Sequence, residues 1–312
     1  MKRLLATVAA LAALALPAVA QEMRTYTDAL GREVEIPVDP QRVVVLNDSN
    51  GGAQTLELGI TPVGMTTRSG VFELGSRYDL SGTTPIGDYG APDLEAIAAL
   101  NPDLIVGYTA SGEAGQSPGE ISAFEALAPF VMPETFAPVH EVMADFAALY
   151  GREEMLAELR SRDAERLAEV RALLDVDFDD LSVSVVQINS EGLVNTFRAG
   201  FFAFGEVLTE LGFRNFPENQ TDSFAEGECC TPDVSMERIQ DFDADVLFYV
   251  HYTPDTDPMN DPLFRSLNAV QAGQAFEWDD DWWGNTYGTR MNVLDDLAAW
   301  FTETPIRADV HP

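Results

Sequence analysis

Arginine and aromatic side chains are the residues of this sequence best suited to binding a ligand. The chain has 52 acidic and 18 basic residues, and Lys2 is its only lysine. With so few cations, an arginine in a cleft would attract an anionic ligand, and aromatic rings would pack on flat apolar edges of that ligand. In α/β folds ligands bind outside the carboxyl ends of strands, so residues that follow predicted strands are favoured. The predicted ligand-binding residues are Arg68, Tyr108, Arg198, Tyr252, Trp282, Trp283, Tyr287 and Arg290.

Each of these residues also has an ordinary structural interpretation. Arginine is common on exposed surface loops, which is the alternative for Arg68 and Arg198. Aromatic side chains bury a large area and usually belong to a core, which is the alternative for Trp282 and Trp283. The position of each side chain relative to a cleft decides between the two interpretations.

Metal-ion and phosphate chemistry are disfavoured by the residue types. His140, His251 and His311 are the only histidines and lie far apart in the sequence, whereas a bare-metal site usually needs several imidazoles together. Cys229 and Cys230 are adjacent, which is unfavourable for a disulfide, and we interpret them as a loop feature. A glycine-rich phosphate loop needs a lysine, and none occurs beyond the first few residues. We therefore expect no catalytic residues, no metal site and no cofactor.

The first twenty residues have the pattern of a secretory signal peptide. Lys2 and Arg3 precede an apolar run of about 13 residues, too short to cross a bilayer. Residues 18–20, Ala-Val-Ala, form a small-residue cleavage site before Gln21. A lipid anchor would need a cysteine directly after cleavage, and Gln21 stands there. We expect a mature protein in the periplasm with no direct membrane insertion.

Size and charge limit the remaining possibilities. About 290 mature residues exceed the usual size of one hydrophobic core, which favours two lobes. The formal charge of −34 repels phosphate backbones and anionic lipids, so binding to nucleic acid or to a membrane surface is disfavoured.

Predicted strands and helices alternate in both halves of the sequence. Continuous apolar runs such as 42–46, 103–108, 181–188 and 245–250 are typical of buried parallel strands. Each half also contains a predicted helix that ends at Leu-Gly. This alternation predicts an α/β fold with mostly parallel sheets.

The stretch between the halves has a helical pattern. Apolar residues recur at helical spacing from 139 to 174 without a proline, and Gly151 is the position where this helix could bend or split. If continuous, its roughly 36 residues would span about 54 Å, enough to bridge two lobes. The predicted organisation is a signal peptide at 1–20, an N-terminal lobe at 21–138, a bridging helix at 139–175 and a C-terminal lobe at 176–312.

A series of short segments extends along nearly the whole mature sequence. The segments are 27–32, 40–44, 58–64, 93–97, 101–105, 211–213, 234–239, 245–246, 267–270, Trp278 and 294–297. No one segment is decisive, but their order and spacing together are specific. Together they resemble the substrate-binding proteins of siderophore, haem and cobalamin ABC importers.

The resemblance implies a class III periplasmic binding protein, with two Rossmann-like lobes joined by one long α-helix. It also implies that a ferric siderophore is captured between the lobes and delivered to an ABC permease in the inner membrane. Catecholates or carboxylates around Fe(III) leave negative charge, which the predicted arginines would offset while the predicted aromatic residues pack on the chelate. We expect a monomer.

The resemblance also implies contacts with the permease. In relatives, a carboxylate six residues before the closing glycine of the first helix in each lobe meets arginines of the permease. Glu206 fits this position before Gly212, whereas Ala53 occupies it before Gly59. Glu57 is a substitute in the first lobe.

Three alternatives to siderophore transport remain at the level of sequence. The same class of fold binds haem or cobalamin, which the aromatic residues do not exclude. A sensor could report its ligand to a membrane receptor without transport. An enzyme related to the nitrogenase-like architecture would need metal-cluster cysteines, and the adjacent pair is the only one present.

Overall fold

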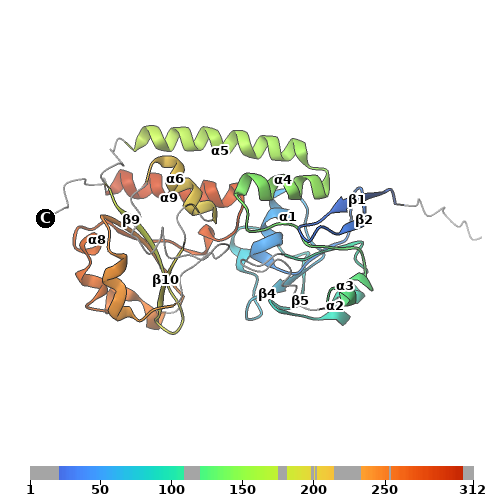
Figure 1. Cartoon of the computed structure of the whole chain (residues 1–312), viewed down its shortest axis with the longest axis horizontal. Coiled ribbons are helices and arrows are strands. Elements are labelled where there is room, and N and C mark those ends of the chain that lie inside the picture. Colours follow the sequence, from blue (N-terminus) through green and yellow to red (C-terminus); the bar gives the residue numbers. More distant parts are fainter. Residues whose placement is uncertain are drawn as a thin grey trace, which may run out of the picture.

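The computed structural model describes residues 21–108, 120–174, 181–197, 200, 202–213, 233–252 and 254–304. These residues form two α/β lobes that lie side by side under a layer of helices (Figure 1). The predicted two-lobed α/β fold is therefore confirmed. Cys229 and Cys230 lie outside the described residues.

The N-terminal lobe contains a hairpin and a six-stranded sheet. The hairpin pairs β1 (Met23–Thr27) with β2 (Glu33–Pro37) in antiparallel register. The sheet has the order β6-β5-β4-β3-β7-β8 and is parallel except for the β5–β6 pair. Its strands are β3 (Val43–Val45), β4 (Gly64–Thr67), β5 (Thr84–Asp88), β6 (Ala91–Pro92), β7 (Leu104–Val106) and β8 (Phe130–Val131). Its short helices are α1 (Ala53–Glu57), α2 (Leu94–Ala99) and α3 (Ile121–Glu125).

Local sequence explains these elements. The β-branched residues of β3 are buried on both faces of the sheet, as parallel strands between helices require. Asp93 caps α2 by accepting hydrogen bonds from the backbone N–H groups of Glu95 and Ala96. Gly64 allows close packing, because a Cβ there would lie 2.4 Å from Leu100 Cδ1.

The C-terminal lobe has a four-stranded sheet of order β10-β9-β11-β12. Strands β9, β11 and β12 are parallel, and β10 is antiparallel to β9. The strands are β9 (Val183–Ile188), β10 (Val194–Thr196), β11 (Val246–His251) and β12 (Ala275–Glu277). The helices are α6 (Phe202–Leu211), α8 (Asn268–Gln271) and α9 (Tyr287–Glu303).

Short helical turns connect these elements in both lobes. Two of them, η1 and η2, lie near the cleft described below. The turns are η1 (Asp48–Gly52), η2 (Glu73–Ser76), η4 (Met236–Phe242), η5 (Pro254–Thr256), η6 (Pro258–Asn260), η7 (Phe264–Ser266) and η8 (Asp280–Trp282).

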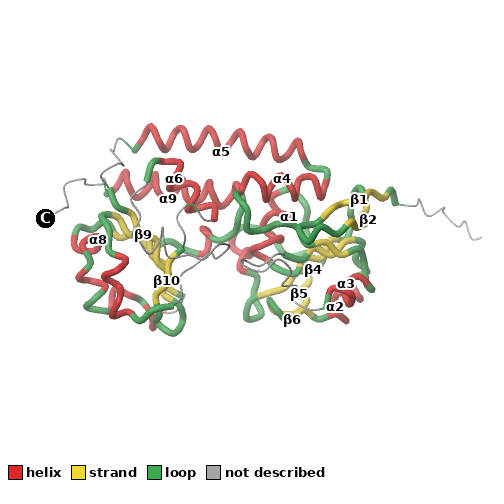
Figure 2. The backbone as a smooth tube through the Cα atoms, viewed as in Figure 1, coloured by secondary structure: helices red, strands yellow, loops and turns green. Residues whose placement is uncertain are grey.

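Two helices, not one, occupy the stretch predicted as a single bridging helix. α4 (Val139–Tyr150) ends at Gly151, which has a left-handed φ of 64°, and α5 (Glu153–Leu173) follows. The chain reverses there, so α5 runs back over α4 and continues across the second lobe (Figures 1 and 2). The helix is thus split at Gly151, the position named from the sequence, so the 54 Å span of a continuous helix does not apply. The 21 residues of α5 extend about 31 Å.

The start of α9 provides a second connection between the lobes. Tyr287 packs in the hydrophobic core of the N-terminal lobe, whereas Val293 and Leu297 of the same helix belong to the core of the C-terminal lobe. Asn285 Nδ2 donates a hydrogen bond of 2.7 Å to the Ala137 carbonyl. The lobes are thus joined by α5 and by an inserted segment.

Candidate ligand-binding cleft

A cavity of about 750 Å³ lies between the two lobes. Side chains of both lobes line it, and several follow the carboxyl ends of parallel strands: Ser49 after β3, Arg68 after β4 and Tyr252 after β11. This is where α/β folds bind ligands. The lining residues are Ser49, Asn50, Arg68, Ser69, Glu73, Phe136, Gln187, Ser190, Phe197, Phe202, Tyr252, Trp283 and Gly284.

The wall from the N-terminal lobe is mostly polar and contains an ion pair. Arg68 begins a tight turn in which Ser69 and Gly70 both have positive φ, 50° and 81°. Arg68 Nε lies 2.9 Å from Glu73 Oε1. The Arg68 guanidinium also lies 4.6 Å from the centre of the Tyr89 ring, at cation–π distance.

A buried carboxylate fixes the backbone behind this ion pair. Asp48 Oδ2 accepts a hydrogen bond of 2.9 Å from the Glu73 N–H, and Asp48 Oδ1 accepts one of 3.0 Å from the Ser49 N–H. Burial raises the pKa of Asp48, although these hydrogen bonds and the charge of Arg68 act in the opposite direction. Asp48 thus connects two cleft-lining segments, at Ser49 and Glu73.

The wall from the C-terminal lobe is mostly aromatic. Trp283 meets Phe197 and Phe202 edge to face, with ring centres 5.6 and 6.1 Å apart. Phe202 also lies 6.0 Å from Phe136, which belongs to the N-terminal lobe. This wall offers ring faces and edges to a ligand that has flat apolar surfaces.

Arg77 holds the Trp283 backbone in place from the other lobe. Its NH2 group donates a hydrogen bond of 3.0 Å to the Trp283 carbonyl, and its NH1 group donates one of 3.2 Å to the Asp281 carbonyl. Arg77 Nε also pairs with the Asp281 carboxylate at 3.5 Å. This arginine is a positioning residue for the aromatic wall, and sequence reasoning missed it.

Three of the eight predicted ligand-binding residues line the cleft. These are Arg68, Tyr252 and Trp283, and 42% of Tyr252 is exposed. Tyr108 is buried behind the wall, where its ring lies 5.4 Å from that of Tyr89. Arg198 lies outside the described residues.

Besides Tyr108, three other predicted residues do not line the cleft. Trp282 is fully buried in the C-terminal core, and its Nε1 donates a hydrogen bond of 2.8 Å to Asp296 Oδ2. Tyr287 is buried at the lobe junction, and its hydroxyl accepts a hydrogen bond of 3.1 Å from Arg160 Nε. These aromatic residues pack the interior, so the prediction of ligand contact is wrong for both.

Arg290 is the third residue that the cleft prediction misplaced. Only 3% of it is exposed. It pairs with Asp163 of α5 at 2.8 Å, and with Glu206 and Glu210 of α6 at 3.2 and 2.8 Å. A cation buried among three carboxylates joins helices and is not available to a ligand in the cleft.

The two carboxylates predicted to dock on a permease are also engaged inside the protein. Glu206 Oε1 accepts a hydrogen bond of 2.8 Å from the N–H of Val139, the first residue of α4. Its Oε2 pairs with Arg290, and burial raises its pKa. The structure therefore gives Glu206 the role of joining α4 and α6.

Glu57 lies against the start of α9, a helix whose N-cap is Thr286. Burial raises the pKa of Glu57 to about 7, and the backbone N–H groups of Gly288 and Tyr287 and the Thr286 hydroxyl act in the opposite direction. A carboxylate is stabilised at a helix N-terminus. Because Glu57 is turned toward the other lobe, a role in docking is not supported.

The predicted set lacks several other lining side chains, among them Glu73, Phe136, Phe197 and Phe202. Phe197 directly follows β10, a strand that the sequence analysis did not predict. Glu73 and Phe136 lie in irregular segments, and only the fold brings them to the cleft.

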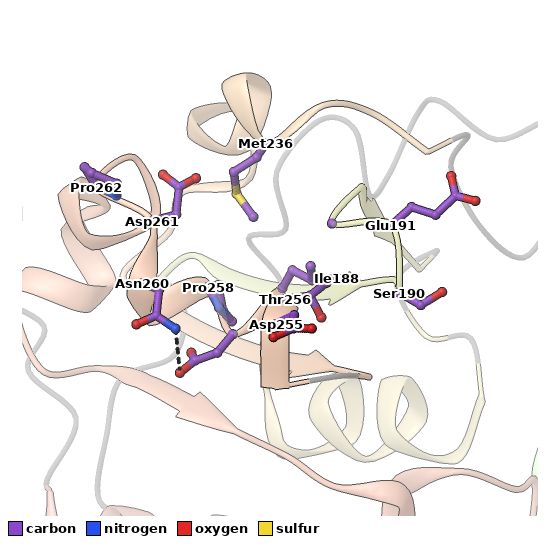
Figure 3. A pocket seen from close by; sticks show the side chains of 12 residues that line it. Ile188, Ser190, Glu191, Met236, Asp255, Thr256, Pro258, Asn260, Asp261 and Pro262 are labelled. Atoms are coloured by element: carbon purple, nitrogen blue, oxygen red, sulfur yellow. Dashed lines mark hydrogen bonds between the residues drawn. The ribbon is translucent and has the colours of Figure 1, made fainter.

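A smaller pocket of about 370 Å³ lies within the C-terminal lobe. Asp255, Asp257 and Asp261 line it, and Asp255 and Asp261 are seen in Figure 3. Asp257 accepts a hydrogen bond from the Met259 N–H, and Asp261 accepts one from the Leu263 N–H. Within the described ranges no group of three or more His, Cys, Asp or Glu side chains could hold a metal ion. We interpret these carboxylates as turn caps.

Among the described helices, none is long and apolar enough to cross a membrane. Two α/β lobes, a helix that crosses both and a cleft at the carboxyl ends of their strands define a class III periplasmic binding protein. A model of the family described as periplasmic binding protein matches residues 52–282. The chain belongs to this family, whose members are substrate-binding proteins of transport systems.

Two curated relatives cover most of the chain. The probable siderophore-binding lipoprotein YfiY of Bacillus subtilis is 31% identical over 298 residues, which cover 90% of this chain and 88% of that protein. The Fe(3+) dicitrate-binding periplasmic protein FecB of Escherichia coli is 24% identical, over 86% of this chain and 87% of that protein.

Solved structures show the same fold. Staphylococcus aureus SirA complexed with staphyloferrin B superposes with a TM-score of 0.71 at 23% identity, over 92% of this chain and all of that chain. Bacillus subtilis FeuA complexed with ferri-bacillibactin gives a TM-score of 0.73 at 18% identity, over 91% of this chain and all of that chain.

Proposed function

We propose that this protein captures a ferric siderophore or a related iron chelate in the cleft between its lobes and delivers it to an ABC importer. The observation that carries the proposal is the cleft itself, in which the guanidinium of Arg68 faces a space of about 750 Å³ walled by Phe197, Phe202 and Trp283. This volume is that of a site for a small molecule. Relatives named as binding a siderophore, Fe(3+) dicitrate or staphyloferrin B support the ligand class.

Each wall has a separate task in binding. Arg68 offsets the negative charge that carboxylate or catecholate oxygens leave around Fe(III). Trp283, Tyr252 and the phenylalanines pack on the organic part of the chelate. Arg198, directly after Phe197 in the sequence, remains a predicted second cation of this site.

The remaining features of the proposal concern location and partners. Membership of the family places the protein outside the cytoplasm. We propose that the signal peptide is cleaved near Ala20 and that a monomer works in the periplasm. The partner is an inner-membrane permease.

Tryptophan fluorescence tests the proposal. Fe(III) complexes absorb in the emission range of tryptophan, so a chelate bound beside Trp283 should quench the emission of the mature protein. We expect saturable quenching by at least one ferric chelate and less quenching in the Trp283→Phe variant. Failure of citrate, hydroxamate and catecholate complexes of Fe(III) to quench would contradict the proposal.

The same purified protein tests the alternatives. Haem or cobalamin would give visible absorbance after growth with each ligand, and saturable binding of either would replace the siderophore. A hydrolase pattern, Gly-x-Ser-x-Gly, occurs at 115–119, which lies outside the described residues. Its serine comes 11 positions in the sequence after the last residue of β7. A nucleophile elbow places that serine directly after a strand, so binding without catalysis is the better-supported role.

A further inference from the structure

In the cleft, the carboxylate of Glu73 lies beside the guanidinium of Arg68, the group proposed to bind an anionic ligand. Both side chains line the cleft, and they are 41% and 29% exposed. The pair is therefore accessible from the cavity. Any anionic group that approaches Arg68 also approaches the carboxylate of Glu73.

The contact between the two side chains is electrostatic and poorly aligned for hydrogen bonding. Arg68 Nε lies 2.9 Å from Glu73 Oε1, yet this buried Nε–H has no hydrogen-bond acceptor among the residues that the structure describes. Glu73 thus neutralises the charge of Arg68 without satisfying its donor. An anionic ligand with a planar carboxylate can supply both the charge and aligned hydrogen bonds.

Both partners are held in place by their surroundings. The guanidinium of Arg68 lies over the Tyr89 ring, and the Glu73 backbone is fixed by its hydrogen bond to buried Asp48. A ligand that displaces the Glu73 carboxylate from Arg68 therefore leaves this backbone hydrogen bond intact. This arrangement suits a counter-ion that a ligand displaces.

We propose that Glu73 is a specificity-determining residue, the resident counter-ion of Arg68 that an anionic Fe(III) chelate must displace. The inference rests on the proposed function and adds a ligand class to it. A chelate that carries a carboxylate replaces Glu73 on Arg68. An uncharged chelate binds with the ion pair intact, so Glu73 affects its affinity little.

Binding of two Fe(III) complexes to wild type and Glu73→Gln tests this inference. The probes are ferric citrate, prepared with excess citrate, and an uncharged ferric trihydroxamate, both followed by tryptophan quenching. Glutamine keeps the size of the side chain and removes the competing charge. We expect ferric citrate to bind roughly tenfold more tightly to the variant and the trihydroxamate to change by less than about twofold. The gain for ferric citrate should shrink at high salt.

The Arg68→Gln background separates displacement from general repulsion. There, Glu73→Gln should give no gain for ferric citrate, because no guanidinium remains to be released. An equal gain in that background, or an unchanged citrate affinity in the single variant, would overturn the role of Glu73 while leaving the proposed function intact. Absence of binding by both complexes to every variant would contradict the proposed function and this inference together. Unchanged thermal unfolding of Glu73→Gln is the control for folding.

Discussion

Arginine meets carboxylates in two regions of this protein, with opposite consequences. In the cleft, Arg68 and Glu73 are 41% and 29% exposed and form one poorly aligned contact. Under α5, Arg290 and Asp163 are 4% and 9% exposed and form two hydrogen bonds, of 2.8 and 3.0 Å. The exposed pair can exchange partners with a ligand, whereas the buried one cannot open without leaving a charge unpaired. Residue type alone did not distinguish these roles, and burial does.

The largest effect is expected from removing the buried cation. Arg290→Met should lower the free energy of unfolding by about 3–5 kcal/mol, because Asp163 and Glu206 lose their compensating charge. Urea unfolding followed by circular dichroism measures this. The matched control is Arg166→Met, whose exposed ion pairs with Glu169 and Asp295 should contribute less than about 1 kcal/mol. Equal losses in both variants would show that burial does not separate the two kinds of arginine.

The second prediction concerns Glu57, a carboxylate that lies against the start of α9 and whose pKa is raised by burial. Burial raises the pKa of Glu57 from 4.5 to about 7. Because the folded pKa exceeds the unfolded one, the stabilising contribution is complete below pH 4.5 and is lost as the pH rises through 7. The free energy of unfolding should therefore fall between pH 5 and pH 8, with up to about 3 kcal/mol of the fall due to Glu57.

The Glu57→Gln variant isolates this contribution. Asp48, Asp145, Glu206 and Asp296 also have pKa values raised by burial, so wild type alone cannot assign the effect. We expect a flatter pH dependence of unfolding in Glu57→Gln and no flattening in the exposed control Glu158→Gln. Identical pH profiles for wild type and Glu57→Gln would refute the assignment.

The third prediction concerns the exposed cation of the cleft. Arg68→Gln should weaken binding of an anionic ferric chelate by about 1.5–3 kcal/mol, the usual contribution of a hydrogen bond to a charged group. Stability should change by less than about 1 kcal/mol, because the pair with Glu73 is exposed. Chelate titration and urea unfolding of the same preparation give both values. A stability loss as large as that of Arg290→Met would remove the distinction between the two regions.

The smallest effect is expected on the aromatic wall. Trp283→Leu keeps an apolar side chain and loses the edge-to-face contacts with Phe197 and Phe202, which contribute about 0.5–1.5 kcal/mol beyond burial. The packing of its ring on the chelate has a similar magnitude, so calorimetry should show binding of charged and uncharged chelates weakened alike by about 0.5–1.5 kcal/mol. A loss confined to charged chelates would show that the two walls do not have separate tasks.

The sequence was sufficient to predict the two lobes, because strand and helix patterns are local. Buried runs such as 43–45 and 246–250 are strands in the structure. The rule that ligands bind just after strands also identified Arg68 and Tyr252, which line the cleft. The bridging helix was mistaken in length because helical spacing continues past Gly151, while the left-handed conformation of that glycine reverses the chain.

The errors in the site have a different physical cause. Trp282, Tyr287 and Arg290 lie close to Trp283 in sequence, but the segment between η8 and α9 passes into the other lobe. Only Trp283 of this group reaches the cavity. Which side chains face the cleft depends on that long-range packing, and no local pattern reports it. Glu73 could not be identified from a local pattern either, because only the folded structure shows its contact with Arg68.

The inserted start of α9 also determines how this protein can be divided. Because Tyr287 completes the core of the first lobe, a fragment that stops at Leu174 would lack part of its own interior. Exchange of whole lobes between relatives therefore has to carry Asn285 and Tyr287 together with the first lobe, although they come more than a hundred positions later in the chain. The boundary that matters for building chimaeras is spatial and does not coincide with any single cut in the sequence.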